Sequence, residues 1–472
     1  PQYTTEGSDF IRWYLPKTLT TFVVQSKLNR TDKNILRAVA SKNITNVCYG
    51  NIINSSFVSV WSPLQLENYR LTRSRTLNKC EVAFLDDSTV IEMFSKFKNL
   101  NSFTMSITSS TLLHFFFEKK TKIEHLKFMN NKQYMETISN LSMYPPEQGY
   151  KRFFESVQNT KTLAILLQID DFNDSMLLRS LQYLSLVRLS ICKATTTYYF
   201  GRGGQKHKSD LNRAIFQDLK IGLANSKNTL EHFTLELPVS LPNEEENPVE
   251  DLGDTLDGFT KIKELKLVNN PDCFWPNLKK TFEKLTHVTR LKFFEFTLKF
   301  ENNVEDVLYL MNFINQQVEL ETLNLRFVSD RILTRSFTAI TETIAKKQTI
   351  KNLTLEFGSF FSCEVSSIVK MIFELKNLEK LSIITGRNFI KNHPFLQRFY
   401  TAIFRSKRLR ELTVSTYYDL ITKYGMKWLI DRLEKFKRFS SLQLDFLYEN
   451  IMKIFPFEEK LKQLQDSMQR RP

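Results

Sequence analysis

The sequence predicts an α/β solenoid, in which short parallel strands form one curved sheet and helices lie outside it. Three observations lead to this fold class. A strand-like pattern with apolar residues at relative positions 1, 4 and 6 recurs along most of the chain. The copies are evenly spaced, and a helix-like stretch follows each strand. The chain has 472 residues, of which 42% are hydrophobic, and this is enough for a large core.

The strand pattern is most regular in the second half of the chain. Successive copies are 32, 26, 32, 30, 28, 31 and 30 residues apart. Apolar and polar residues alternate within each copy, as expected for a short strand with one buried face. Degenerate copies precede them, and TKTLAILLQIDDF (160–172) is expected to supply one more strand. The copies begin at Leu77, Leu100, Ile123, Leu181, Leu230, Ile262, Val288, Leu320, Ile350, Leu378, Leu409 and Phe439.

The segments between the strands predict amphipathic helices. Residues 329–349 and 362–377 place apolar residues at steps of three and four. Ser329, Asp330 and Ser362 are the expected N-caps. A strand and a helix of about 30 residues cannot bury their own apolar faces, so the copies must stack side by side. The alternatives are a doubly wound α/β domain, or unrelated strands and helices, and the even spacing favours the solenoid.

These repeats resemble the leucine-rich repeat family, specifically its long, ribonuclease-inhibitor-like type. The motif L-x-x-L-x-L-x-x-N is clearest in IEHLKFMNN (123–131) and IKELKLVNN (262–270), and most other copies lack the ninth-position Asn. The resemblance covers residues 77–446. It implies a horseshoe-shaped leucine-rich repeat solenoid with a parallel concave sheet and outer helices.

Two insertions are predicted in the solenoid, near 193–222 and 238–258. The first contains GRGGQKHKSD (201–210), which we expect to be a loop because it is rich in glycine. Its cations Arg202, Lys206 and Lys208 are candidate contacts for RNA or another anion. The second insertion carries seven carboxylates and no Lys or Arg, without the spacing of a calcium loop, and predicts a solvated loop.

The two ends of the chain fit the repeat poorly. Residues 1–76 predict a helical N-terminal cap. The segment 14–42 within them contains Leu15-Pro16, Val23, Leu28, Asp32, Leu36 and Val39, and with these residues it loosely resembles an F-box. Residues 447–472 predict a helical C-terminal cap over the last repeat.

The composition narrows the class of partner and compartment. Lys and Arg number 66 against 51 Asp and Glu, so the formal net charge is +15, which favours an acidic protein surface or RNA as partner. The five cysteines are dispersed and form no C-x-x-C pair, which predicts a reducing intracellular compartment, the cytoplasm or the nucleus. We expect no signal peptide and no membrane span, and nothing implies a homo-oligomer.

No sequence motif predicts catalysis. The chain has no HExxH, G-x-S-x-G, GxGxxG or P-loop string. Cys48 and Cys192 lie in apolar strand-like runs, where we expect them to be small buried residues. The sequence therefore predicts a protein that is not an enzyme and that has no cofactor or metal site.

Two groups of cations are predicted to contact a partner. Positions 3, 5 and 7 of each repeat should line the concave sheet, where Arg290, Lys292 and Arg326 are expected to form a basic spot on a face of mixed polarity. A second group follows the helix C-termini, where cations also stabilise the helix dipole by about 0.3–1 kcal/mol each. Stacking should align this group in a basic ridge. The ridge residues are Lys346, Lys347, Arg405, Lys407 and Arg408.

A solenoid with a mixed concave face and no catalytic motif predicts a non-catalytic protein–protein interaction scaffold, as a subunit of a larger intracellular assembly. Two alternatives stay open. The segment 14–42 allows an F-box-type substrate receptor of a ubiquitin ligase. The net charge and the 201–208 segment allow an RNA-associated subunit of a ribonucleoprotein.

Overall fold

The chain divides into two compact units, Pro1–Leu235 and Glu236–Pro472. The computed structural model describes part of each unit. The described residues are 21–24, 46–49, 79–82, 102–107, 123–130, 150–151, 154–155, 157–167, 177–193, 216–237, 248–269, 278–298, 304–327, 334–357, 365–385, 393–416, 423–434, 439–446, 459–460 and 462–467.

The first unit contains a run of parallel strands. Each strand from β1 to β7 pairs in parallel with the next strand along the chain. The strands are β1 (Thr21–Val24), β2 (Asn46–Tyr49), β3 (Lys79–Val82), β4 (Ser102–Ile107), β5 (His125–Asn130), β6 (Thr162–Leu167), β7 (Arg188–Lys193) and β8 (His232–Leu237). The 3-10 helices η3 (Ser180–Tyr183) and η4 (Ala224–Ser226) lie between the last strands.

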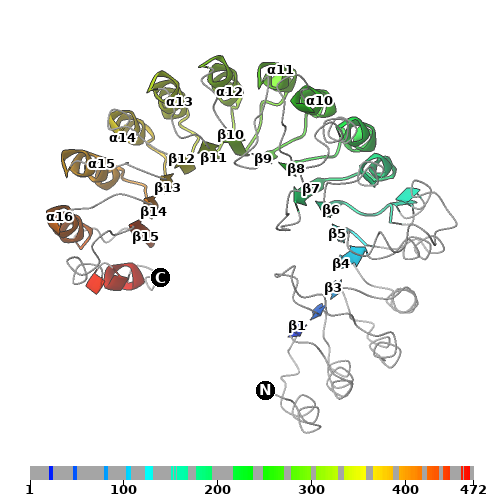
Figure 1. Cartoon of the computed structure of the whole chain (residues 1–472), viewed down its shortest axis with the longest axis horizontal. Coiled ribbons are helices and arrows are strands. Elements are labelled where there is room, and N and C mark those ends of the chain that lie inside the picture. Colours follow the sequence, from blue (N-terminus) through cyan, green and yellow to red (C-terminus); the bar gives the residue numbers. More distant parts are fainter. Residues whose placement is uncertain are drawn as a thin grey trace, which may run out of the picture. The chain divides into compact units, whose positions relative to one another are not determined.

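The second unit repeats one strand and one helix. Its strands pair in parallel in chain order, and its helices lie on the outer side of the sheet (Figure 1). The strands are β9 (Glu264–Asn269), β10 (Phe293–Leu298), β11 (Thr322–Phe327), β12 (Asn352–Phe357), β13 (Lys380–Thr385), β14 (Glu411–Thr416) and β15 (Ser441–Phe446). The helices are α10 (Pro248–Thr255), α11 (Leu278–Lys284), η5 (Leu285–His287), α12 (Val304–Gln316), α13 (Thr334–Lys346), α14 (Val365–Glu374), α15 (His393–Arg405) and α16 (Lys423–Leu433).

Equivalent leucines occupy equivalent places in successive repeats. Leu323 is the register partner of Leu353, which pairs onward with Leu381 and then Leu412. All four side chains are buried. In β11 and β12 burial alternates strictly along the strand, so one face packs against the helices and the other does not. This arrangement confirms the predicted leucine-rich repeat solenoid, with a parallel sheet and outer helices.

The outer helices bury the apolar stripe that their sequences predict. In α13 the buried residues Phe337, Ile340 and Ile344 recur at steps of three and four. Neighbouring helices of the second unit contact one another along the outer layer. The predicted N-caps Ser329, Asp330 and Ser362 lie outside the described residues.

The predicted register of one repeat is wrong by three residues. Phe294, and not Leu291, is the register partner of both Leu265 and Leu323. The run VTRLKFFEF (288–296) has apolar residues at positions 1, 4 and 6 whether counting begins at Val288 or at Leu291, so the pattern alone is ambiguous. With Leu291 as position 1, the steps from Ile262 and to Leu320 are both 29 residues. The structural register is therefore more even than the predicted one.

The predicted register of β7 is wrong by five residues. The register partner of Leu163 and Phe233 is Leu189, so this repeat begins at Leu186 and not at Leu181. Leu181 is buried within η3, which explains why it is apolar. The expected strand in 160–172 is confirmed as β6.

Both predicted insertions contain helix in their described parts. In the acidic segment 238–258, α10 buries Leu252, and Leu256 directly after the helix is also buried, so these residues belong to the outer layer and are not a solvated loop. In the segment 193–222, residues 216–222 are helical and bury Phe216 and Leu219.

The parallel pairing begins before residue 77. β1 and β2 lie within residues 1–76 and continue the register of β3. Apart from β1, the F-box-like segment 14–42 lies outside the described residues, and the cap or F-box assignment stays a prediction. At the other end, residues 459–460 and 462–467 are helical, and the Gln465 side chain donates to the Leu444 carbonyl of β15 at 3.4 Å. None of the helices in the described ranges has both the length and the apolar character needed to cross a membrane.

Candidate functional site

The strands β9–β15 present every second side chain on the sheet face that the helices leave uncovered. Because register is kept from strand to strand, these side chains form three rows, at repeat positions 3, 5 and 7. We call this surface the inner face. Its rows are Glu264, Phe293, Thr322, Asn352, Lys380, Glu411 and Ser441; Lys266, Glu295, Asn324, Thr354, Ser382, Thr413 and Gln443; and Thr297, Arg326, Glu356, Ile384 and Ser415.

Charges on the inner face pair across neighbouring strands. In each pair the two residues are direct register partners, and the charged atoms lie 2.9–3.2 Å apart. Exposed ion pairs contribute only about 0–1 kcal/mol each to stability, so their main effect is to hold opposite charges at fixed positions. The pairs are Lys266–Glu295, Arg326–Glu356 and Lys380–Glu411.

An uncharged strip runs between the paired charges. From β11 to β15 the central row contains only Ser, Thr, Asn and Gln side chains. In the row beside it, the Asn352 amide donates to Thr322 Oγ1 at 3.0 Å. The face therefore combines hydrogen-bonding groups with balanced charge, which suits a protein partner better than a nucleic-acid backbone.

The predicted basic spot is not assembled on this face. Arg326 lies on it, but Arg290 and Lys292 precede β10, because the register of that repeat differs from the prediction. Arg290 pairs with Glu319 at 3.7 Å, and Arg326 pairs with Glu356 at 2.9 Å. The sequence analysis did not predict the ion pairs between neighbouring strands. Opposite charges at the same position of successive repeats could have indicated them.

The residues of the predicted basic ridge differ in burial and in their contacts. Lys347 is half-buried, and its ammonium donates to the carbonyls of Asn315 and Gln317 at the end of α12. It therefore caps a helix, as cations at helix C-termini do. Burial lowers the pKa of Lys347. Lys346 and Lys407 are exposed, on α13 and in the turn after α15.

Two arginines of the ridge contact neutral groups in the preceding repeat. The Arg405 guanidinium lies over the Phe373 ring at 5.8 Å from its centroid. Arg408 Nη1 donates to Asn377 Oδ1 at 2.8 Å. The Asn377 amide in turn donates to the Gln348 carbonyl at 2.7 Å, so hydrogen bonds link three successive repeats along this edge.

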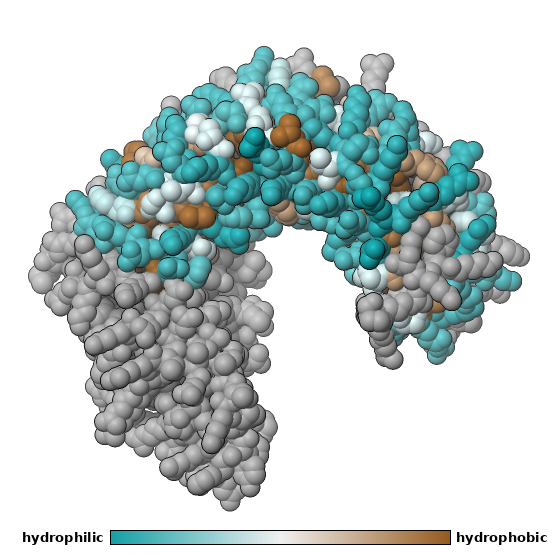
Figure 2. Space-filling view, turned by 180° about the vertical axis from the view of Figure 1, so that it is seen from behind, coloured by the Kyte–Doolittle hydropathy of each residue, from teal (hydrophilic) through white to brown (hydrophobic). Residues whose placement is uncertain are grey.

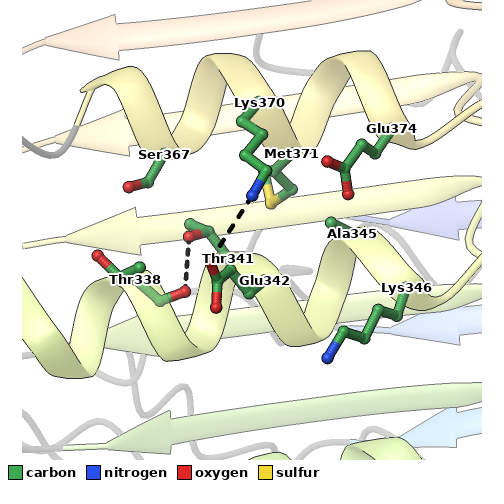
Figure 3. Close-up of a pocket in the computed structure, with 9 residues that line it drawn as sticks. All are labelled: Thr338, Thr341, Glu342, Ala345, Lys346, Ser367, Lys370, Met371 and Glu374. Carbon is green, nitrogen blue, oxygen red and sulfur yellow. Dashed lines mark hydrogen bonds and ion pairs between the residues drawn. The ribbon is translucent and has the colours of Figure 1, made fainter.

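A groove of about 210 Å³ lies between the neighbouring helices α13 and α14 on the outer layer (Figure 3). Hydroxyls of Thr338 and Ser367 lie toward one end, and Lys346 and Glu374 lie at the C-terminal end of the two helices. Lys370 and Glu342 face each other across it at 3.7 Å. Its lining of hydroxyls, one ion pair and the apolar side chains of Ala345 and Met371 does not define a catalytic constellation.

In the first unit, the neighbouring strands β7 and β8 carry polar side-chain contacts. Arg188 Nη2 lies 3.4 Å from His232 Nδ1. Cys192 is half-buried, with Ser190 Oγ 3.2 Å from its Sγ, so the prediction that it is a buried core residue is wrong. The register shift explains this, because it moves Cys192 to position 7. The side chain of Cys48 lies outside the described part of the chain.

Several predicted features fall on undescribed residues. Arg202, Lys206 and Lys208 lie outside the described residues, as does the rest of the 201–210 segment. Over the described ranges, no three His, Cys, Asp or Glu side chains lie together in a way that could hold a metal ion.

The described surface is mainly hydrophilic. On the face shown in Figure 2, hydrophobic residues form small separate spots and no continuous patch. Large hydrophobic side chains that are exposed within the described residues are Ile221, Leu308, Val318 and Phe373. The Arg405 guanidinium lies over the ring of Phe373.

Comparison with known proteins finds no matching family model and no matching curated protein. Solved structures do match. A TLR13–ssRNA13 complex is 15% identical, with a TM-score of 0.39, and covers 83% of this chain; this chain spans 45% of the TLR13 chain. The leucine-rich repeat-containing protein LegL7 from Legionella pneumophila is 11% identical (TM-score 0.37; 70% of this chain, 97% of that one). A leucine-rich repeat protein of Leptospira interrogans is 13% identical (TM-score 0.33; 89% and 100%).

Proposed function

We propose that this protein is a non-catalytic protein-binding scaffold, a subunit of a larger intracellular assembly, which contacts its partner through the inner face. The observation that carries the proposal is the in-register array of polar side chains on β9–β15, with opposite charges held across neighbouring strands. A solenoid gives such an array a broad binding surface, because each repeat adds one strand to it.

The charge pattern favours protein over nucleic acid as the partner of the inner face. A groove for a phosphate backbone needs cations at most positions. Here the carboxylates of Glu295, Glu356 and Glu411 neutralise the neighbouring cations. Charge complementarity of this alternating kind contributes to the specificity of a protein interface more than to its affinity.

Exchanging the charges of one pair should disrupt recognition without affecting folding. In the double variant Arg326→Glu with Glu356→Arg the ion pair is retained in reverse, so we expect an unchanged thermal unfolding midpoint. The partner, which meets inverted charges, should bind about tenfold or more weakly. The partner is first identified by placing a photo-crosslinking residue at Thr354 and treating an extract of the source cells with light.

The matched control for the crosslink is the same photoreactive residue at Asn312, on the outer surface of α12. A discrete adduct from Thr354 and none from Asn312 supports the proposal. An adduct only from Asn312, or undiminished affinity in the charge-exchanged variant, contradicts it. An RNA adduct would favour the ribonucleoprotein alternative, and a ubiquitin-ligase adaptor would favour the F-box alternative.

A further inference from the structure

The edge of the second unit where α13, α14 and α15 end is rich in cations. We define the basic edge as Lys346, Lys376, Arg405, Lys407 and Arg408, which are all exposed. Exposed cations also occur in earlier described turns, at Lys261 and Arg290, but the turn directly before these repeats has none. In the preceding repeat the corresponding turn contains Val318 and Glu319, and Glu319 pairs with Arg290.

The arginines of the basic edge are held in place without losing their charge. Arg405 lies over Phe373, and Arg408 donates to the Asn377 amide oxygen, so both contacts are to neutral groups. Gln348 fixes the adjoining turn, since its side chain donates to the Glu374 carbonyl at 2.9 Å. Side chains that are already ordered lose less conformational entropy when they bind. Both guanidiniums keep further donors for a bidentate contact.

Phe373 adds an apolar contact to the charged surface. Its side chain is 44% exposed, which is unusual for a phenylalanine on an otherwise hydrophilic surface. The centre of a protein interface often contains arginines beside an aromatic side chain that the partner buries on binding. The basic edge therefore offers charge and apolar area together.

We infer that the basic edge binds an acidic peptide segment of a partner protein, with partner carboxylates on Arg405 and Arg408 and an apolar side chain against Phe373. A nucleic acid fits less well, because a phosphate backbone needs cations along its whole length, whereas this surface also carries the exposed side chains of Glu374, Glu379 and Phe373. The inference rests on the proposed scaffold function, but it concerns a surface separate from the inner face.

The test measures binding of a short fluorescent peptide, in which glutamates flank one leucine, to the full chain. A peptide with glutamines in place of the glutamates is the ligand control. Arg405→Gln with Arg408→Gln should weaken binding of the acidic peptide about tenfold or more, since two charge-assisted contacts are lost. Phe373→Ala should also weaken it, and added salt should reduce the affinity of the unaltered protein.

Matched controls are available on the same layer. Arg398→Gln removes an exposed arginine from the other part of α15, and Leu308→Ala removes an exposed apolar side chain from α12; neither should change the affinity. If the double glutamine variant unfolds, Arg405→Lys with Arg408→Lys replaces it and should weaken binding less, because charge is kept while bidentate geometry is lost.

Three results would overturn the inference: equal binding of the glutamate and glutamine peptides, equal loss in Arg398→Gln, or tighter binding of a single-stranded RNA oligonucleotide through the same arginines. Any of these results would leave the proposed function of the inner face unaffected. Conversely, if exchanging the charges of Arg326 and Glu356 does not weaken partner binding, the proposed function is contradicted. The peptide result at the basic edge would still stand.

Discussion

Replacing Phe294 with alanine should lower the free energy of unfolding by about 3–5 kcal/mol, the usual cost of removing a buried phenylalanine. Phe294 is fully buried in β10, and its ring centroid lies 5.9 Å from that of Phe296 and 5.3 Å from that of Phe313 in α12. Its loss leaves a cavity between strand and helix. Urea unfolding followed by circular dichroism measures the change.

The neighbouring Phe293→Ala variant is the control for Phe294. Phe293 lies on the inner face and is partly exposed, so we expect a loss of about 1 kcal/mol or less. The two substitutions remove the same side chain from adjacent positions. If Phe293→Ala is the more destabilising variant, the register of β10 is wrong by one residue, and the opposite face of the strand is buried.

Replacing Gln317 with alanine should lower the free energy of unfolding by about 2–4 kcal/mol. The Gln317 side chain is fully buried beyond the end of α12. Its Oε1 accepts from the Leu291 amide at 3.2 Å, and its Nε2 donates to the carbonyls of Val288 at 2.7 Å and Phe313 at 3.1 Å. Without the side chain these buried backbone groups lose partners, at about 1–3 kcal/mol for an unsatisfied group.

Gln316→Ala is the matched control, because Gln316 is the adjacent residue and is exposed. Its effect should stay within about 0.5 kcal/mol, as is usual for surface substitutions. Thermal or urea unfolding of both variants provides the comparison. Equal stability of the Gln317 and Gln316 variants would mean that the link between the two repeats contributes nothing.

Sequence periodicity was sufficient to predict the fold, because each repeat buries alternate residues of one short strand. Leu323, Leu353, Leu381 and Leu412 are all at the predicted fourth position and are all buried. The predicted register was wrong where apolar residues at the spacing of the pattern extend beyond one copy, at Val288–Phe296 and Leu181–Ile191. There two frames satisfy the same pattern, and only pairing with neighbouring strands distinguishes them.

The acidic segment shows how composition can hide a helix. The prediction of a loop in 238–258 relied on its seven carboxylates and its lack of Lys and Arg. The apolar residues Leu252 and Leu256 are nevertheless one helical turn apart, and Pro248 is the first residue of α10, a position that suits proline. Asp254 of α10 forms an ion pair with Lys284 of α11, so one of the carboxylates of this segment links neighbouring helices.

The candidate surfaces could be predicted less well than the fold. Sequence places cations near helix ends, but it does not show which carbonyl, ring or carboxylate lies opposite in the next repeat. Lys347 was expected in a partner-binding ridge and instead caps α12. Arg405 and Arg408 were expected in the same ridge and contact only neutral groups among their described contacts. These contacts form between successive repeats, so they cannot be predicted from the sequence of one repeat alone.

Distances along the inner face test the central claim, that successive repeats stack with their strands in register. In a background with the five cysteines replaced, spin labels at Glu264 and at Lys380, Glu411 or Ser441 report separations over four, five and six strand steps. Strands spaced about 4.8 Å apart predict separations that rise in nearly equal increments, from about 19 Å to somewhat below 29 Å. Separations that do not increase in this order would contradict the solenoid.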